Sequence, residues 1–524
     1  MTRFLKPFRV IVSLMFLLSI TFVFIDFRQI LPSYWYDAFT CLQFVPSILK
    51  FIGFAGIASC GFLIVLVITQ LYGRVYCSTI CPLGILQDII SFIFRKLSSK
   101  KIRFKYAKPR NILRYTLLGL TVFPLLFGSL TVLSLLEPYS NFGRFFSDLG
   151  RPVYILVNNL LSELLVHIKV YAIAPNDIVH FDWIAVIFTI VMIIAVVRLS
   201  SSFGRLYCNT ICPVGTFLGF LSKFSVFQIK MDPNTCNQCA KCAFVCKSQC
   251  INIKEQTVDN SRCVGCFNCI QSCDNGSIKF KFSYITVKKD VKTAPMTDES
   301  KRKFIVNSLL LTSAFIGLSK GVKAIEPSGK KGKALIPVKK TSCSSPPGSK
   351  SIEHFNKNCT ACHLCVSACP NGVLQPSLFD YGLAGFLQPY MDYKSGFCNF
   401  DCTKCGEVCP TGAIIPLAKE QKKTCQVGIV KFIEKNCIVY TNETSCGSCS
   451  EHCPTQAVKM VPYKGKLTIP QVKEDICVGC GACEHVCPAI PNKAIYVDGN
   501  VVQKVAKKPE IKKLEVKKLD DFPF

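Results

Sequence analysis

The chain has 524 residues, half of them apolar, and a formal net charge of +29 at pH 7. This length allows several domains. The basic residues gather in patches typical of loops beside a membrane and of solvated linkers, and no groove-reading motif accompanies them, so we expect no nucleic-acid partner. No Gly-rich phosphate loop opens a helix, which argues against a nucleotide-binding fold. Of the 33 cysteines, 27 lie after position 235, so we expect a multidomain protein with an apolar part followed by cysteine-rich modules.

Residues 1–230 are predicted to form an α-helical membrane domain with four main transmembrane helices. Four apolar runs approach the length that crosses a hydrocarbon layer of about 30 Å. They span residues 8–25, 48–71, 112–136 and 183–199. A further stretch, residues 153–171, is too polar for a lipid-facing span, and we expect an interfacial or buried helix there. The loop over residues 72–110 is dense in Lys and Arg, which places it on the cytoplasmic side.

Two segments of this domain repeat each other. YGRVYCSTICPLG (residues 72–84) and FGRLYCNTICPVG (residues 203–215) are identical at nine of thirteen positions. Each follows a predicted membrane helix, which indicates an internal repeat. Four thiols could then meet across a pseudo-two-fold axis and hold a metal or an iron–sulfur centre, or act as redox dithiols; they are Cys77, Cys81, Cys208 and Cys212. The alternative is that each CxxxCP motif only shapes a tight turn at a helix start.

Residues 231–285 have the pattern of an α+β dicluster ferredoxin of the bacterial type. Two C-x2-C-x2-C-x3-C runs follow each other, and in such runs the fourth cysteine ligates the neighbouring [4Fe–4S] cluster. Crossed ligation groups Cys236, Cys239, Cys242 with Cys273, and Cys263, Cys266, Cys269 with Cys246. Cys250 lies outside the pattern, and we expect a packed thiol there. Because the module follows a cytoplasmic loop, we expect it in the cytoplasm.

Residues 286–350 are predicted to be a basic linker. Its apolar segment, residues 300–321, looks like an internal twin-arginine signal with Lys301-Arg302 in place of two arginines. Whether it is cleaved or stays as a membrane helix is open. Either way it would carry the chain outward, so we expect residues 351–500 in the periplasm. Residues 501–524 form a Lys-rich tail.

Residues 351–500 contain four successive four-cysteine motifs, each followed by proline. These predict four [4Fe–4S] clusters. The motifs are Cys359, Cys362, Cys365, Cys369; Cys398, Cys402, Cys405, Cys409; Cys437, Cys446, Cys449, Cys453; and Cys477, Cys480, Cys483, Cys487.

Three other chemistries compete for this region. CTACH (residues 359–363) also has the pattern of a c-type haem attachment site, but that hypothesis gives Cys365 and Cys369 no role. Zinc sites use four ligands each, and four proline-terminated runs are hard to divide that way. Disulfide scaffolds do not need this spacing. Clusters therefore explain the pattern best, about 24 iron atoms in six clusters, and we expect neither haem nor flavin.

Two families resemble successive parts of the chain. Residues 1 to about 285 resemble the membrane polyferredoxins of the NapH and NosR type, on their paired CxxxCP loops and the dicluster module. Residues 300–500 resemble the exported four-cluster polyferredoxins of the NapG type, on the signal-like start, the PPGS of residues 346–349 and the four motifs. The resemblance implies a fusion of the two that passes electrons from the quinol pool to a periplasmic reductase, of the nitrate or nitrous oxide type.

The resemblance also implies a nested arrangement of the last four motifs, the first with the last and the second with the third. The implied ligand sets are Cys359, Cys362, Cys365 with Cys487; Cys477, Cys480, Cys483 with Cys369; Cys398, Cys402, Cys405 with Cys453; and Cys437, Cys446, Cys449 with Cys409.

The sequence thus predicts a membrane-anchored electron-transfer protein of the bacterial inner membrane, partnered by quinol and by a periplasmic reductase or carrier. Whether it oxidises quinol itself, as an enzyme, is open. Quinol protons could pass to acidic or imidazole groups near the outer face, namely Glu137, Glu163, His167, His180 or Asp182. One alternative is a reductive assembly factor for a metalloenzyme, and another is a cysteine-rich structural anchor. No predicted centre lies inside the hydrocarbon layer, so the transmembrane path is missing.

Overall fold

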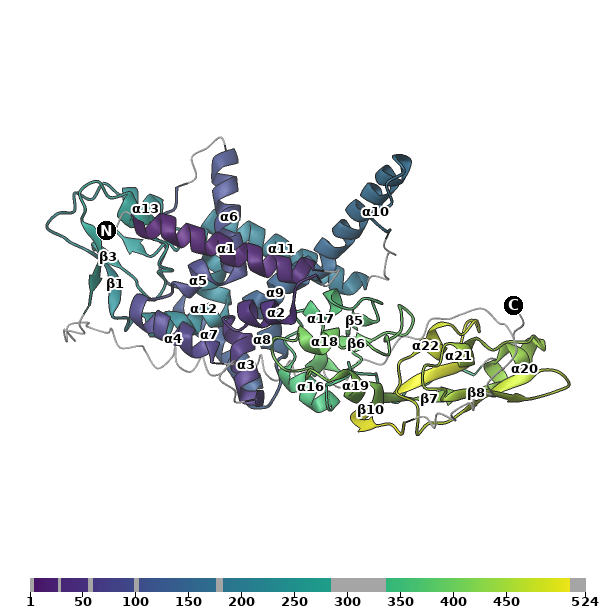
Figure 1. Ribbon diagram of the computed structural model, residues 1–524. Coiled ribbons are helices and arrows are strands. Elements are labelled where there is room, and N and C mark those ends of the chain that lie inside the picture. Colours follow the sequence, from purple (N-terminus) through teal and green to yellow (C-terminus); the bar gives the residue numbers. More distant parts are fainter. Residues whose placement is uncertain are drawn as a thin grey trace, which may run out of the picture.

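The computed structural model describes residues 4–26, 30–54, 60–98, 103–175, 182–283 and 336–508. The N-terminal helices form the middle of an elongated molecule (Figure 1). The small module with β1, β3 and α13 lies at one end, and the cysteine-rich C-terminal domain lies at the other. The apolar segment at residues 300–321 lies outside the described residues.

Two described helices are long and apolar enough to cross a membrane, α1 (Leu5–Ile25) and α11 (Trp183–Phe203). Large apolar side chains such as Leu18 on α1 and Ile194 on α11 are exposed. Exposed apolar helix faces suit a lipid environment. Two such helices suggest a membrane association only weakly, because length and composition alone support it.

Each of the two remaining predicted spans contains two helices, so neither is a single helix, and the crossing of the membrane by four spans stays a prediction. The second consists of α3 (Phe44–Phe54) and α4 (Gly61–Tyr72), and a Cβ on Gly61 would lie 1.9 Å from the carbonyl oxygen of Cys41. The third consists of α7 (Asn111–Leu126) and α8 (Thr131–Leu136). Pro124 lies near the end of α7, and Gly128 has a φ of +76°. Glycine has no Cβ and so adopts the positive φ at which a helix ends, and proline has no backbone N–H to donate within a helix. An apolar composition reveals neither effect.

The helix predicted near residues 153–171 is α10 (Arg151–His167). It projects away from the other helices in Figure 1, and Val153 and Leu164 are 62% and 53% exposed. The expectation of a buried helix was therefore wrong, and an interfacial position stays a prediction.

Shorter helical elements make up the rest of the N-terminal part. They are α2 (Ser33–Thr40), α5 (Tyr76–Thr79), α6 (Pro82–Leu97), α9 (Pro138–Arg144), the π-helical turns η3 (Phe145–Gly150) and η4 (Tyr207–Ile211), and α12 (Pro213–Ser222). The prolines of both CxxxCP motifs begin a helix, α6 and α12. Proline suits a first helical position, because that position has no intrahelical partner for a backbone N–H. Each CxxxCP motif therefore does shape the start of a helix.

The module after α12 has the predicted α+β form. Its outer strands, β1 (Phe227–Met231) and β4 (Ile278–Phe282), pair antiparallel with Phe227 opposite Phe282. Between them lie β2 (Ile251–Asn252), β3 (Thr257–Val258) and the short helices α13 (Lys241–Phe244) and α14 (Asn268–Gln271). Ile229 and Ile278 pack with the cysteines in its core.

The C-terminal domain has two similar halves joined by one antiparallel pair, β7 (Cys425–Phe432) with β10 (Ile495–Val505). The first half contains the hairpin of β5 (Leu374–Pro376) and β6 (Pro389–Met391). The second contains β8 (Val458–Pro462) and β9 (Thr468–Val472). Its helices are short: α16 (Ile352–Asn358), α17 (Leu364–Ser367), η5 (Leu383–Gly385), α18 (Lys404–Glu407), α19 (Lys419–Thr424), η6 (Glu434–Asn436), α20 (Ile438–Asn442), α21 (Ser448–Glu451) and α22 (Ala482–His485).

This domain is larger than the predicted range of residues 351–500. Upstream, the backbone N–H of Ile336 donates to the side chain of Asn436 (2.9 Å), and Ser345 is fully buried. Downstream, β10 continues to Val505. The predicted linker and tail were therefore too long, because Lys-rich composition alone does not distinguish a packed segment from a solvated one.

Candidate iron–sulfur sites

The four loops with C-x2-C-x2-C spacing share one backbone conformation. In each loop, the residue two positions after the first cysteine and the residue directly after the second cysteine have a positive φ. These residues are Gln238 and Ala240, Gly265 and Phe267, Ala361 and His363, and Gly479 and Gly481. Left-handed residues of this kind turn successive backbone N–H groups toward one enclosed space, which suits a negatively charged group. The N–H groups of Ala361 and Gly479 donate to Cys359 Sγ (3.5 Å) and Cys477 Sγ (3.3 Å).

In the small module the structure places the thiols in the two groups that crossed ligation predicts. Cys242 lies within electrostatic range of Cys236, Cys239 and Cys273. The second group contains Cys263, Cys266, Cys269 and Cys246. Ligation itself stays a prediction.

Cys250, expected to be a packed thiol without a role, is buried beside the second group of the small module. Its Sγ lies 3.6 Å from that of Cys246, and it also hydrogen-bonds Cys263. The hydrogen bond from Cys250 is the main reason that the pKa of Cys246 falls to about 7. Cys250 therefore stabilises the thiolate form of a predicted ligand, which the motif spacing did not indicate.

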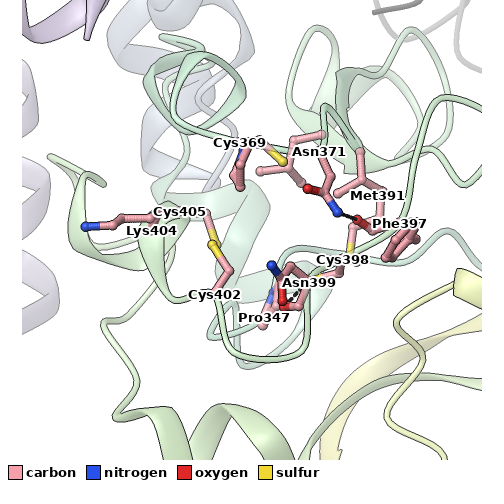
Figure 2. Close-up of a pocket in the computed structure, with 13 residues that line it drawn as sticks. Pro347, Cys369, Asn371, Met391, Phe397, Cys398, Asn399, Cys402, Lys404 and Cys405 are labelled. Atoms are coloured by element: carbon pink, nitrogen blue, oxygen red, sulfur yellow. Dashed lines mark hydrogen bonds between the residues drawn. The ribbon is translucent and has the colours of Figure 1, made fainter. Parts of the chain in front are cut away.

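In the C-terminal domain the nested pairing was wrong. Figure 2 shows Cys369 of the first motif with Cys398, Cys402 and Cys405 of the second, around one cavity. Cys359, Cys362 and Cys365 lie near Cys409 in the same way. In the other half, Cys487 lines a cavity with Cys437, Cys446 and Cys449, and Cys453 lies near Cys477, Cys480 and Cys483.

The fold explains why neighbouring motifs pair. The hairpin β5–β6 separates the first two motifs and folds back, so that α17 packs against α18; in the second half α21 packs against α22 in the same way. Each of the two cavities is lined by four cysteine thiols, three from one motif and the fourth from its neighbour. The same four donors in both halves fit the same group.

The thiol chemistry fits clusters better than the alternatives. Among the described residues, the 24 cysteines of the predicted ligand sets form no disulfide, which argues against a disulfide scaffold there. His363 of the CTACH motif is buried, 3.0 Å from Asp148 and 2.9 Å from the carbonyl oxygen of Leu387, which leaves it no position as a haem ligand. Among the described residues, no three His, Cys, Asp or Glu side chains converge as a single metal ion requires, whereas a cluster spreads its four thiolates around a cube.

The buried thiols also need positive charge. Burial raises the pKa of Cys398 and of Cys449 to about 12. Thiolates form at neutral pH in such places only beside a cation or a metal. The irons of a cluster would supply that charge.

The four CxxxCP thiols do come together. Cys77, Cys81, Cys208 and Cys212 are each 2–3% exposed, and Cys81 lies within electrostatic range of the other three. We call this group the thiol quartet. It is almost fully buried and packs among apolar side chains such as Val65 and Leu218.

Two arginines outside the CxxxCP motifs hold the two loops of the thiol quartet together. Arg205 Nη1 donates to the carbonyl oxygen of Cys77 (2.7 Å), and Arg74 Nη2 donates to that of Cys208 (3.1 Å). Each guanidinium also lies 3.9 Å from the sulfur of Cys208 or Cys77. Both arginines are fully buried. The sequence did mark these two arginines, because they are among the nine positions at which the two repeats are identical.

The thiol quartet lies between the two ferredoxin parts. On one side, Arg74 Nη1 donates to the carbonyl oxygen of Ser261 (3.0 Å), two residues before Cys263. On the other side, Tyr207 next to Cys208 accepts a hydrogen bond from Asn141 (3.2 Å), and Arg144 reaches both Asn141 (2.7 Å) and the carbonyl oxygen of Ala361 (3.4 Å).

The expected proton acceptors have diverse surroundings. Glu137 is buried and accepts a hydrogen bond from the backbone of Ser140. Glu163 and His167 are exposed on α10. Asp182 caps α11 through the N–H of Ile184 (3.0 Å), and His180 lies outside the described residues.

Comparisons with known proteins agree with this arrangement. A family described as a 4Fe-4S binding domain matches residues 54–103 and 185–232, which contain the thiol quartet. Families described as 4Fe-4S dicluster domains match residues 358–414 and 444–490. The match over residues 358–414 contains the first and second motifs together, as the observed pairing does.

Several curated proteins are similar to parts of the chain. The ferredoxin-type protein NapF of Escherichia coli K12 is 30% identical over 152 residues, which cover 29% of this chain and 84% of NapF. The methylamine utilization ferredoxin-type protein MauM of Methylophilus methylotrophus is 34% identical, over 30% of this chain and 72% of MauM. An uncharacterized protein of Methanocaldococcus jannaschii is 26% identical, over 47% of this chain and 88% of its own length. No solved structure matches.

Proposed function

The chain belongs to the family of ferredoxin-type iron–sulfur proteins that includes NapF and MauM, and from this premise we propose that it is a membrane-anchored electron conduit with six [4Fe–4S] clusters. Such clusters accept and donate single electrons. The observation that carries the proposal is the position of the thiol quartet, buried between the small module and the C-terminal domain.

Six ligand sets follow from the thiol groups. In the small module they are Cys236, Cys239, Cys242, Cys273 and Cys263, Cys266, Cys269, Cys246. In the C-terminal domain they are Cys359, Cys362, Cys365, Cys409; Cys398, Cys402, Cys405, Cys369; Cys437, Cys446, Cys449, Cys487; and Cys477, Cys480, Cys483, Cys453.

The thiol quartet would hold a seventh centre. Four sulfur donors suit an iron–sulfur centre, and Arg74 and Arg205 place two positive charges beside them. A buried guanidinium without an anionic partner is costly. Arg74 has hydrogen bonds to Asn209, Ser261 and Cys208 but no carboxylate partner in the part of the chain that the structure describes, so thiolates in the quartet would compensate its charge.

Such a centre would supply the transmembrane path that the sequence did not reveal. The contacts through Ser261 on one side and through Tyr207, Asn141 and Arg144 on the other connect it with both ferredoxin parts. The resemblance to NapH, NosR and NapG supports quinol as the electron donor and a periplasmic reductase as the acceptor. The small module would then face the cytoplasm.

Iron and acid-labile sulfide analysis of anaerobically purified protein tests the cluster assignment. Six clusters give about 24 iron atoms per chain, and a cubane in the thiol quartet raises this to about 28. The variant Cys77→Ser/Cys208→Ser should lower the content only by that difference, whereas Cys41→Ser/Cys60→Ser, in the same helical part, should change nothing. Colourless, sulfide-free protein would exclude the conduit and leave a structural anchor.

Reduction by menaquinol in proteoliposomes tests the path. In the native protein the C-terminal clusters should become reduced, and in Cys77→Ser/Cys208→Ser their reduction should slow at least tenfold. Equal rates would contradict a path through the thiol quartet. A strain without the gene separates this function from reductive assembly, because a lost conduit leaves the reductase metal-loaded but idle, and a lost assembly factor leaves it without metal.

A further inference from the structure

A large cavity opens between α1, α6 and the small module. Its volume is about 860 Å³. Its walls carry six cationic side chains, Lys6, Arg9, Arg95, Lys96, Arg103 and Lys247, against one carboxylate, Asp88. The lining therefore has a surplus of five positive charges.

The carboxylate of Asp88 already forms ion pairs with three cations. Asp88 lies 2.8 Å from Arg205, 3.2 Å from Lys247 and 3.3 Å from Arg9. Burial favours the neutral acid, but Arg205, Lys247 and Arg9 outweigh it and hold the pKa of Asp88 well below its ordinary value. Arg9 is only 7% exposed, and its Nε has no hydrogen-bond partner among the described residues. Lys96 and Arg103 are exposed, and Lys6, Arg95 and Lys247 are partly buried, so their charges are open to a ligand and favour an anion in the cavity.

Part of the cavity wall is apolar. Val10 and Leu14 of α1 and Ile89 and Phe92 of α6 line it, and Leu14 and Phe92 are 44% and 66% exposed. The apolar wall thus continues to the outer surface of the helices. An occupant with an anionic head and hydrocarbon chains matches both parts of the cavity. Basic pockets of this kind beside membrane helices bind anionic lipid head groups.

We propose that this cavity binds one anionic phospholipid, with its phosphate among the basic side chains and its acyl chains along Leu14, Ile89 and Phe92. A quinone fits less well, since its ring is uncharged and the cavity has no free carboxylate to take a quinol proton. The proposal rests on the membrane association in the proposed function but not on electron transfer, so the two can fail separately.

The lipid would also fasten the small module to the helices. Lys247 follows Cys246, Asn268 precedes Cys269, and both line the cavity opposite α1. Arg103 lies over the ring of Phe244 in the same wall (5.2 Å). The phosphate would thus neutralise charges from both sides of this junction.

Native mass spectrometry of the full chain in detergent tests the site with phosphatidylglycerol and phosphatidylcholine. The variant Arg95→Gln/Lys96→Gln/Arg103→Gln should bind phosphatidylglycerol about a hundredfold more weakly, because each basic residue near an anionic lipid contributes about fivefold. The matched control is Lys105→Gln/Lys108→Gln/Arg110→Gln, which removes the same charge from a different cavity and should bind normally. Unchanged cluster absorbance confirms that each variant is folded.

Any of four results would overturn the lipid site. The first three are equal affinity for phosphatidylcholine, an equal loss in the control variant, and displacement of the lipid by millimolar inorganic phosphate. The third would assign the cavity to a free anion. Bound menaquinone that competes with phosphatidylglycerol would assign it to quinone instead.

Discussion

His363 of the C-terminal domain lies 3.0 Å from Asp148 of the helical part, and both side chains are buried. Asp148 also accepts a hydrogen bond from Thr189 on α11 (2.7 Å). A Cβ on Gly143 would lie 2.3 Å from the carbonyl oxygen of Cys362, so the two parts are in direct backbone contact here. The first cysteine motif is thus fixed on the helices by a polar contact that solvent does not reach.

The variant His363→Ala should weaken this docking. It leaves the buried Asp148 with one partner fewer, at a cost of about 1–3 kcal/mol. Hydrogen exchange of the amides around Ala361 and Leu387 should accelerate by a factor of about 5 to 150. His452→Ala, an exposed histidine in the same domain, is the control. Unchanged exchange in His363→Ala would show that the pair contributes nothing to docking.

Replacing Arg74 or Arg205 by Gln should lower the reduction potential of a centre in the thiol quartet. Reduction adds negative charge, and each guanidinium lies 3.9 Å from a sulfur. A shift of about 60 mV corresponds to a tenfold change for a one-electron couple. EPR-monitored redox titration measures it, with Arg74→Lys as the variant that keeps the charge. The electrostatic role would be contradicted if Arg74→Lys, which keeps the charge, lowered the potential as much as Arg74→Gln does.

Iron loss in double variants tests the corrected pairing. Cys487 lines the cavity of Cys437, Cys446 and Cys449, so Cys487→Ser and Cys437→Ser/Cys487→Ser should both lose about 4 iron atoms. Cys359→Ser/Cys487→Ser should lose about 8, because it removes ligands of two clusters. Nested ligation predicts the reverse, with about 8 iron atoms lost in Cys437→Ser/Cys487→Ser and about 4 in Cys359→Ser/Cys487→Ser. Cys343→Ser, outside all four motifs, should lose none.

Cys250 should influence the cluster beside it although it is not an expected ligand. Its thiol hydrogen-bonds Cys246 and Cys263, and donors to ligand sulfurs raise the potential of a cluster. Cys250→Ala should therefore lower the potential of one cluster of the small module, and Cys250→Ser, which keeps a donor, should restore most of it. Loss of about 4 iron atoms in both variants would mean instead that Cys250 is a ligand.

The sequence predicted most where local spacing determines local geometry. The C-x2-C-x2-C loops, the prolines that begin α6 and α12, and the α+β form of the small module all follow from residues close together in the chain. The partner of each fourth cysteine was wrong in the C-terminal domain, since it depends on where the β5–β6 hairpin directs the chain. Apolar composition likewise could not show that Gly128 ends α7 or that α3 and α4 are separate helices.

Buried charges were the least visible feature in the sequence. Arg74 and Arg205 lie in apolar surroundings, and a hydropathy pattern gives no reason for a charge there. Only the folded chain shows which groups each arginine contacts. Asp88 similarly resembles an ordinary helix residue until three cations surround it.

The crossed arginine contacts make each repeat dependent on its counterpart. The loop with Cys77 is held by a guanidinium from the second repeat, and the loop with Cys208 by one from the first. A polypeptide with a single copy would satisfy these contacts only by forming a homodimer with its two protomers related by a twofold rotation. Fusion of two such copies into one gene would make the association permanent. Either copy could then diverge outside the interface and still remain associated with the other.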